Sequence, residues 1–145
     1  MEKRIKLYPQ QHDFFTCPDT VAAFIGGIRS GKTYSGCLWG LSQSTPGTVG
    51  LVVAPTYPML RDVTWRTMLE IGGDIFKVNK SEMALTIPGS GEILFRSADT
   101  PDRIRGITAN WALIDEAGYC PPYTYDIVKG RLSGLPGLLD RKAHV

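Results

Sequence analysis

The chain has 145 residues, enough for one domain with a core of its own. Its composition, 43% hydrophobic and 21% charged, is that of an ordinary folded protein, and a net charge of +2 is too small to indicate a partner. Cys17, Cys37 and Cys120 are odd in number and far apart, which argues against a disulfide framework or a zinc cluster. The sequence contains no apolar run of membrane-spanning length, and its charged start lacks the apolar core of a signal peptide, so we expect a cytoplasmic protein.

The first part of the chain predicts a strand, a glycine-rich loop and a helix in succession. Residues 1–20 are mixed and end in the loop-like sequence CPDT. The apolar run Val21–Ile25 is typical of a buried strand. GGIRSGKT follows it, and residues 32–44 predict a helix that ends before Pro46.

The middle of the chain predicts a second strand, a helix and a β-hairpin. Val49–Ala54 is apolar enough for a buried strand, and residues 59–71 predict a helix between Pro58 and a pair of glycines. Residues 83–87 and 92–98 flank the turn sequence PGSG, which indicates a hairpin.

A polar loop over residues 99–110 leads to the last predicted strand, Trp111–Ile114. Strands alternate with helices, and three strands are apolar on both faces. These features predict an α/β fold with a mostly parallel sheet flanked by helices and an antiparallel hairpin at one edge.

The glycine-rich loop matches the phosphate-binding pattern G-x-x-x-x-G-K-[ST] in full. Glycines let successive backbone N–H groups point at phosphate oxygens, and the following helix directs its positive end at the same anion. A lysine in this pattern reaches the β- and γ-phosphates, and the hydroxyl after it ligates Mg²⁺. We therefore expect the phosphates to contact Gly26, Gly27, Ile28, Arg29, Ser30, Gly31, Lys32 and Thr33.

The stretch WALIDEAG supplies the carboxylates that such a loop requires. Asp115 directly follows a buried strand, where a carboxylate can hold Mg²⁺ through water. Glu116 is next and could act as the general base that orients the attacking water. The alternative is that the two acids only cap a strand at the surface.

With these motifs in view, the chain resembles the N-terminal ATPase domain of the large terminase subunit of tailed bacteriophages. The resemblance rests on four segments: LYPQQHDFF (7–15), VAPTYPMLRD (53–62), FRSADTPDRIRGI (95–107) and WALIDEAG (111–118). It implies a P-loop NTPase fold of the RecA-like (ASCE) type with ATP and Mg²⁺ as cofactors. It also implies a motor that pumps double-stranded DNA into capsids, with a portal protein, a small terminase subunit and a ring of copies as partners.

The resemblance assigns a role to the segment before the first strand. Gln11 would contact adenine, with Tyr8 nearby, and Gln10 is the neighbour that could take its place. The alternative is that these are polar surface residues.

The resemblance also assigns roles to arginines. Arg105 is similar to an arginine finger that reaches the nucleotide of a neighbouring subunit, where a guanidinium stabilises charge on the transferred phosphoryl group. Arg103 could be the finger instead, and Arg29 could sense the γ-phosphate. Arg103 and Arg105 could instead be solvated loop charges or pair with Asp99 and Asp102, and Arg29 could be merely solvated.

The chain departs from the family near its end. We find no nuclease domain, and GRLSGLPGLL (130–139) is similar to the approach to a coupling strand that is not found. We therefore expect one ATPase domain, with residues 1–20 as the adenine-binding segment, 21–145 as the core, and a sheet incomplete at its C-terminal side. The alternatives are another P-loop enzyme, such as a helicase-like ATPase or a kinase, and an inert nucleotide-binding prophage remnant.

Overall fold

The computed structural model describes residues 4–133 and 142–144. Within this part of the chain, seven strands form one mixed sheet in the order β1-β7-β6-β2-β5-β4-β3. Neighbouring strands from β1 to β5 are parallel, and β4 and β3 are added antiparallel at one edge. The strands are β1 (Val21–Ala22), β2 (Val49–Ala54), β3 (Lys77–Asn79), β4 (Ala84–Thr86), β5 (Glu92–Ser97), β6 (Trp111–Ile114) and β7 (Lys142–His144).

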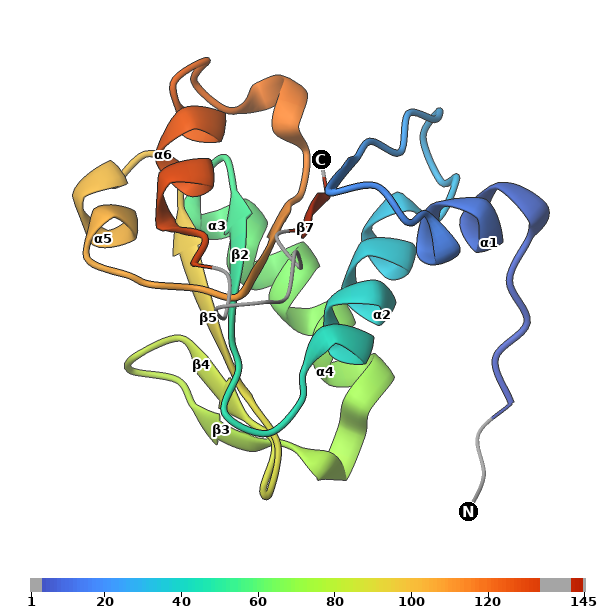
Figure 1. The fold of residues 1–145 in the computed structure, drawn as a ribbon, viewed down its shortest axis with the longest axis horizontal. Coiled ribbons are helices and arrows are strands. Elements are labelled where there is room, and N and C mark those ends of the chain that lie inside the picture. Colours follow the sequence, from blue (N-terminus) through green and yellow to red (C-terminus); the bar gives the residue numbers. More distant parts are fainter. Residues whose placement is uncertain (1–3, 134–141, 145) are drawn as a thin grey trace.

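Helices cover both faces of the sheet (Figure 1). On one face lie α1, α2 and α4, and on the other lie α5 and α6. The helical elements are α1 (Pro9–Thr16), α2 (Lys32–Gln43), α3 (Tyr57–Met59), the π-helix η1 (Leu60–Trp65), α4 (Arg66–Gly72), the 3-10 turns η2 (Gly73–Ile75) and η3 (Ala117–Tyr119), α5 (Pro101–Arg105) and α6 (Thr124–Arg131).

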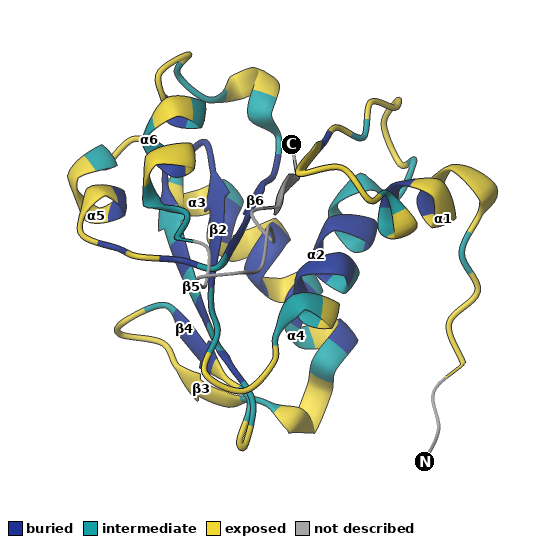
Figure 2. Ribbon diagram, viewed as in Figure 1, coloured by how far each residue is buried: buried dark blue, intermediate teal, exposed yellow. Residues whose placement is uncertain are grey.

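The sheet separates two apolar cores because successive strand residues point to opposite faces. In β2, Val52 and Ala54 join the core beneath α1, α2 and α4, whereas Leu51 and Val53 join the core beneath α5 and α6. Strand β6 alternates in the same way. Figure 2 shows the central strands as the most deeply buried part of the molecule. This burial on both faces explains why β2 and β6 are uniformly apolar, and it confirms the predicted fold class.

The first strand is shorter than predicted. We expected Val21–Ile25 to be buried, but only Val21–Ala22 pair in the sheet, and Ile25 is 94% exposed. The expectation was wrong for residues 23–25 because the backbone leaves the sheet there to begin the glycine-rich loop. Apolar composition alone does not mark that point.

The predicted hairpin forms from the expected residues, since β4 and β5 pair antiparallel, but it does not lie wholly at the edge of the sheet. Residues Glu92–Ser97 pair in parallel with β2 along its whole length, so β5 belongs to the parallel core and not to an antiparallel edge. Strand β4 forms the other arm, and β3, which was not predicted, forms the actual edge. Three-residue strands such as β3 are too short for a clear alternating pattern.

The helix predicted over residues 59–71 is present as a continuous helical run. It begins earlier, at Tyr57, because the Thr56 hydroxyl accepts a hydrogen bond from the Met59 N–H at 3.4 Å and caps the helix. The run contains a π-helical turn at Leu60–Trp65, which hydrophobic periodicity did not predict.

Other helices were missed. The predicted polar loop 99–110 contains α5, which starts at Pro101 and buries Ile104. The segment before β1 contains α1, and residues 130–131, expected to approach a strand, end α6. The remainder of that expected approach, residues 134–139, lies outside the described residues. Strand β7, between β1 and β6, was also not expected. In the part of the chain that the structure describes, no helix has the length and apolar character needed to cross a membrane.

Candidate active site

The glycine-rich loop connects β1 to the first residue of α2, Lys32. It reverses direction through two left-handed residues, Arg29 with φ 63° and Gly31 with φ 77°. A Cβ atom at Gly31 would lie 2.3 Å from Nε2 of Gln11, so this position requires glycine for both its conformation and its contact. The Ser30 hydroxyl is buried in the loop with no hydrogen-bond partner among the described residues. An oxygen-rich ligand in the loop would satisfy it.

The Lys32 ammonium lies over the loop. Its Nζ donates to the carbonyl oxygens of Gly26 at 2.8 Å and Gly27 at 3.0 Å. These two bonds place the positive charge beside the loop amides, where an anion would bind.

The loop and the acidic stretch meet at Thr33 and Asp115. The Thr33 hydroxyl lies 3.0 Å from both carboxylate oxygens of Asp115, which is 7% exposed. The hydroxyl of Thr64, in η1, donates to Oδ2 of the same carboxylate at 2.7 Å. Two threonines from separate elements therefore hold one buried carboxylate, as its burial requires.

Glu116 follows Asp115 in a left-handed conformation, with φ 52°. Its carbonyl accepts from the Tyr119 N–H at 2.9 Å, so the strained residue starts the tight turn η3. Such a conformation costs about 1–2 kcal/mol for a residue with a Cβ, and strain of this kind gathers at functional sites. The half-buried side chain belongs to the same site as Asp115.

One cavity of about 1030 Å³ contains these parts. It is lined by the whole glycine-rich loop, by Phe14 and Met59, and by residues 113–119. The sequence-predicted lysine, hydroxyl and two acids thus share one cavity, and its volume suits a nucleotide. The alternative of two acids that only cap a surface strand is inconsistent with the burial of Asp115 and its contact with Thr33.

The donor set fits Mg²⁺ bound to a nucleotide. Thr33 and Asp115 supply hard oxygen atoms, and Mg²⁺ at phosphate sites takes only one or two protein ligands. Among the described residues, no group of three or more His, Cys, Asp or Glu side chains could hold a metal without such a substrate.

The Asp115 carboxylate contributes to raised pKa values at two thiols. Burial, and then the nearby Asp115 carboxylate, raise the pKa of Cys120 to about 11. The same two causes raise the pKa of Cys37 well above its usual range. Both thiols therefore stay protonated at neutral pH, which excludes them as nucleophiles.

The two glutamines of the N-terminal segment lie in different environments. Gln11 is buried, its Oε1 accepts from the Tyr8 N–H at 2.9 Å, and its amide nitrogen faces Gly31. Gln10 is exposed. Helix α1 therefore brings Gln11, and not Gln10, against the loop, while the Tyr8 side chain is 73% exposed.

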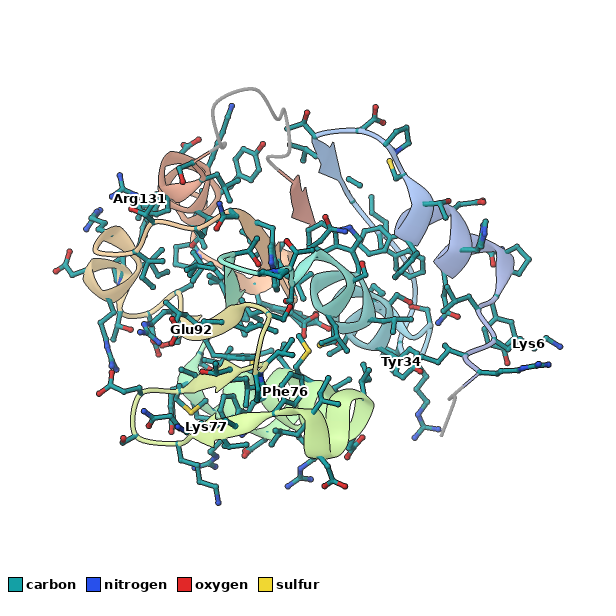
Figure 3. All side chains as sticks on the ribbon, turned by 60° about the horizontal axis from the view of Figure 1, so that its bottom comes forward. Lys6, Tyr34, Phe76, Lys77, Glu92 and Arg131 are labelled. Atoms are coloured by element: carbon teal, nitrogen blue, oxygen red, sulfur yellow. The ribbon has the colours of Figure 1, made fainter. Side chains whose placement is uncertain are left out.

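The arginines differ in whether they line the cavity. Arg29 is exposed and lines the cavity. Arg105, in α5, donates to Asp102 at 2.6 Å, and neither it nor Arg103 is among the described residues that line the cavity. The Arg131 guanidinium holds the Arg105 carbonyl, and Figure 3 shows Arg131 on the side of the molecule opposite Tyr34, which follows the loop.

No family model and no curated protein matches the chain. Among solved structures, the large terminase ATPase domain of Thermus phage P74-26 matches with a TM-score of 0.68 and 20% identity. The large terminase of a second phage, described as a thermophilic bacteriophage, matches with a TM-score of 0.70 and 18% identity.

The chain has the fold of a large terminase ATPase domain. These matches cover 96% and 94% of this chain, but the chain spans only 64% of the Thermus phage domain and 37% of the thermophilic bacteriophage protein. The terminase of the thermophilic bacteriophage has also been solved in complex with ADP and with ATP-gamma-S.

One residue of this terminase-like site was missed in the sequence. Thr64 lies in a predicted helix, and nothing in its local sequence distinguishes it from a surface threonine. The sequence shows only that Thr64 precedes Trp65, which the structure finds buried.

Proposed function

We propose that the chain is the ATP-binding and ATP-hydrolysing domain of a phage DNA-packaging motor. The observation that carries the proposal is the contact between Thr33 and Asp115 inside the cavity that also contains Lys32. It joins the phosphate-binding loop to a strand-end carboxylate, as ATP hydrolysis requires. The shared fold and the nucleotide complexes of the thermophilic bacteriophage terminase support it.

On nucleotide binding, the loop residues would replace contacts within the loop by contacts to the phosphates. The loop amides and the Ser30 hydroxyl would donate to phosphate oxygens. Lys32 would release the carbonyls of Gly26 and Gly27 and donate to the phosphates instead. Gln11, packed on Gly31, would contact the adenine side, and Arg29 would reach the γ-phosphate.

Hydrolysis would be carried out at the acidic end of the cavity. Mg²⁺, when bound, neutralises charge on the phosphates, and Thr33 and Asp115 would hold it. Glu116 would accept a proton from the attacking water and orient that water in line with the γ-phosphate.

The rest of the proposed motor is what the resemblance implies, and the shared fold supports it. Double-stranded DNA, a portal protein and a small terminase subunit would be partners in the host cytoplasm, and a ring of copies would couple hydrolysis to DNA movement. Arg105, which is not among the described residues that line the cavity of its own chain, would act on the nucleotide of a neighbour. ATPase activity that DNA stimulates without strand separation would distinguish this function from that of a helicase.

The experiment that tests the proposal compares two site variants with a surface control. We expect Lys32→Ala to weaken binding of a fluorescent ATP analogue in Mg²⁺ by about tenfold or more, since it removes charge-assisted bonds to phosphate. Glu116→Gln should bind normally and lose about 10²–10⁴-fold in phosphate release. Lys80→Ala, at an exposed lysine outside the cavity, should match the wild type.

Two outcomes count against the proposal. Unchanged nucleotide affinity in Lys32→Ala would show that the loop does not bind phosphate. Wild-type phosphate release no higher than that of Glu116→Gln would identify a nucleotide-binding protein without hydrolysis.

A further inference from the structure

Thr64 is a buried polar side chain in an apolar core. It is 1% exposed and lies between Leu60 and Trp65, which are also buried. Its hydroxyl donates to Oδ2 of Asp115 at 2.7 Å, the shortest of the three contacts to that carboxylate.

This hydrogen bond is not the one that a helical threonine forms by default. Threonine in a helix commonly bonds to the carbonyl one turn earlier in the same helix. Thr64 instead bonds to a residue 51 positions away, in the turn after β6. The π-helix Leu60–Trp65 changes the angular position of the residues within it, and π-helical turns are frequent at functional sites.

Two contacts fix the backbone around Thr64. The thiol of Cys37, in α2, donates to the Thr64 carbonyl at 3.7 Å. The ring of the next residue, Trp65, packs edge-on against Phe95 of β5 with 4.9 Å between centroids. Helix α2 and the sheet therefore fix the backbone that carries the hydroxyl.

The carboxylate would be poorly oriented without this contact. Thr33 donates one hydrogen, which is shared between both oxygens of Asp115, and a single shared donor leaves the carboxylate free to rotate. Thr64 bonds to Oδ2 alone and so distinguishes the two oxygens. Outer partners of this kind commonly set the affinity of a metal site.

We propose that Thr64 is a positioning residue that orients Asp115 for the metal that accompanies the nucleotide, an inference that rests on the proposed function. Thr64 is not among the described residues that line the cavity, and it would act through the carboxylate. Metal-free nucleotide binding is then independent of Thr64, and the tightening of nucleotide binding by Mg²⁺ depends on it.

The test measures the affinity of the whole chain for a fluorescent ADP in EDTA and over a Mg²⁺ titration. Thr64→Val keeps the shape and removes the hydroxyl. We expect its affinity in EDTA to equal that of the wild type, and the Mg²⁺ concentration for half-maximal tightening to rise about 10- to 100-fold. Thr64→Ser should restore the wild-type value, because it returns the donor.

Thr124→Val is the matched control. Thr124 is also a buried threonine, 2% exposed, but its hydroxyl has no partner among the described residues. We expect Thr124→Val to leave the Mg²⁺ dependence of nucleotide affinity unchanged. Circular dichroism would establish that each variant is folded, and Thr64→Cys, with a weaker donor of similar size, should give an intermediate shift if Thr64→Val does not fold.

Three results would overturn the inference. An unchanged Mg²⁺ dependence in Thr64→Val would remove the positioning role. An equal loss of affinity in EDTA and in Mg²⁺ would assign Thr64 to packing. If the wild-type chain binds no nucleotide, that result would contradict the proposed function and, with it, the inference about Thr64.

Discussion

Gln10 and Gln11 are adjacent in the sequence and differ in what they contact. The Gln11 side chain is fixed at its oxygen by the Tyr8 N–H, so only its amide nitrogen, which faces Gly31, is available to a ligand. The approach of its amide nitrogen to Gly31 also makes Gln11 part of the support of the glycine-rich loop. Gln10 projects from the exposed side of α1 and can do neither.

We expect Gln11→Ala to weaken ATP binding by about 3- to 10-fold and Gln10→Ala to leave it unchanged, because a lost hydrogen bond contributes about 1 kcal/mol. Isothermal titration with ATP would measure the effect. Titration with inorganic triphosphate separates its causes: a loss confined to ATP indicates adenine contact, and an equal loss for both indicates support of the loop. Equal affinities of the two variants for ATP would contradict the assignment of Gln11.

At the scale of elements, the pairing of β2 with β6 requires a glycine at position 50. Trp111 of β6 lies beside Gly50 of β2, and a Cβ on that glycine would come within 2.0 Å of the Trp111 ring. The ring cannot easily shift, because it also packs edge-on against Trp39 with 5.7 Å between centroids. The pair therefore fixes how closely α2, which carries Lys32 and Thr33, approaches β6, the strand that precedes Asp115.

Gly50→Ala should lower the free energy of unfolding by about 1–3 kcal/mol, because overpacking forces a rigid ring to move. Gly130→Ala is the matched control, since Gly130 lies in α6 with open space where a Cβ would be. There the same substitution should raise stability by up to about 1 kcal/mol. Urea denaturation would measure both, and equal changes of the same sign would contradict the argument.

Sequence patterns predicted the elements whose signals are local. The loop motif, α2, β2 and β6 each combine a recognisable run of residues with clear boundaries, and the acids were placed correctly at the end of β6. Helix α5 and strand β3 are too short for periodicity to emerge. Thr64 and the orientation of Gln11 could not be predicted, because each depends on a contact that only the assembled fold creates.

At the scale of the whole molecule, α5 lies outside the candidate cavity, because none of its residues, Pro101–Arg105, is among those that line it. Arg105 forms an exposed ion pair with Asp102, and such pairs contribute only about 0–1 kcal/mol. A stronger anionic partner could therefore take the guanidinium from Asp102 at little cost. In the proposed motor, that partner would be the nucleotide of another copy, since Arg105 is not among the described residues that line the cavity of its own chain.

This reasoning predicts that Arg105→Ala has unchanged nucleotide affinity but reduced turnover, and that wild-type turnover per molecule rises with protein concentration. Complementation provides the decisive measurement of phosphate release. Lys32→Ala subunits keep Arg105 but bind nucleotide weakly, whereas Arg105→Ala subunits bind nucleotide normally but lack the arginine. Their mixture should hydrolyse more ATP than the two separate samples combined, since one subunit supplies the arginine that the other lacks. Arg103→Ala in place of Arg105→Ala is the control for the neighbouring position, and it should be active alone. A mixture no more active than its parts would leave Arg105 as a surface charge paired with Asp102.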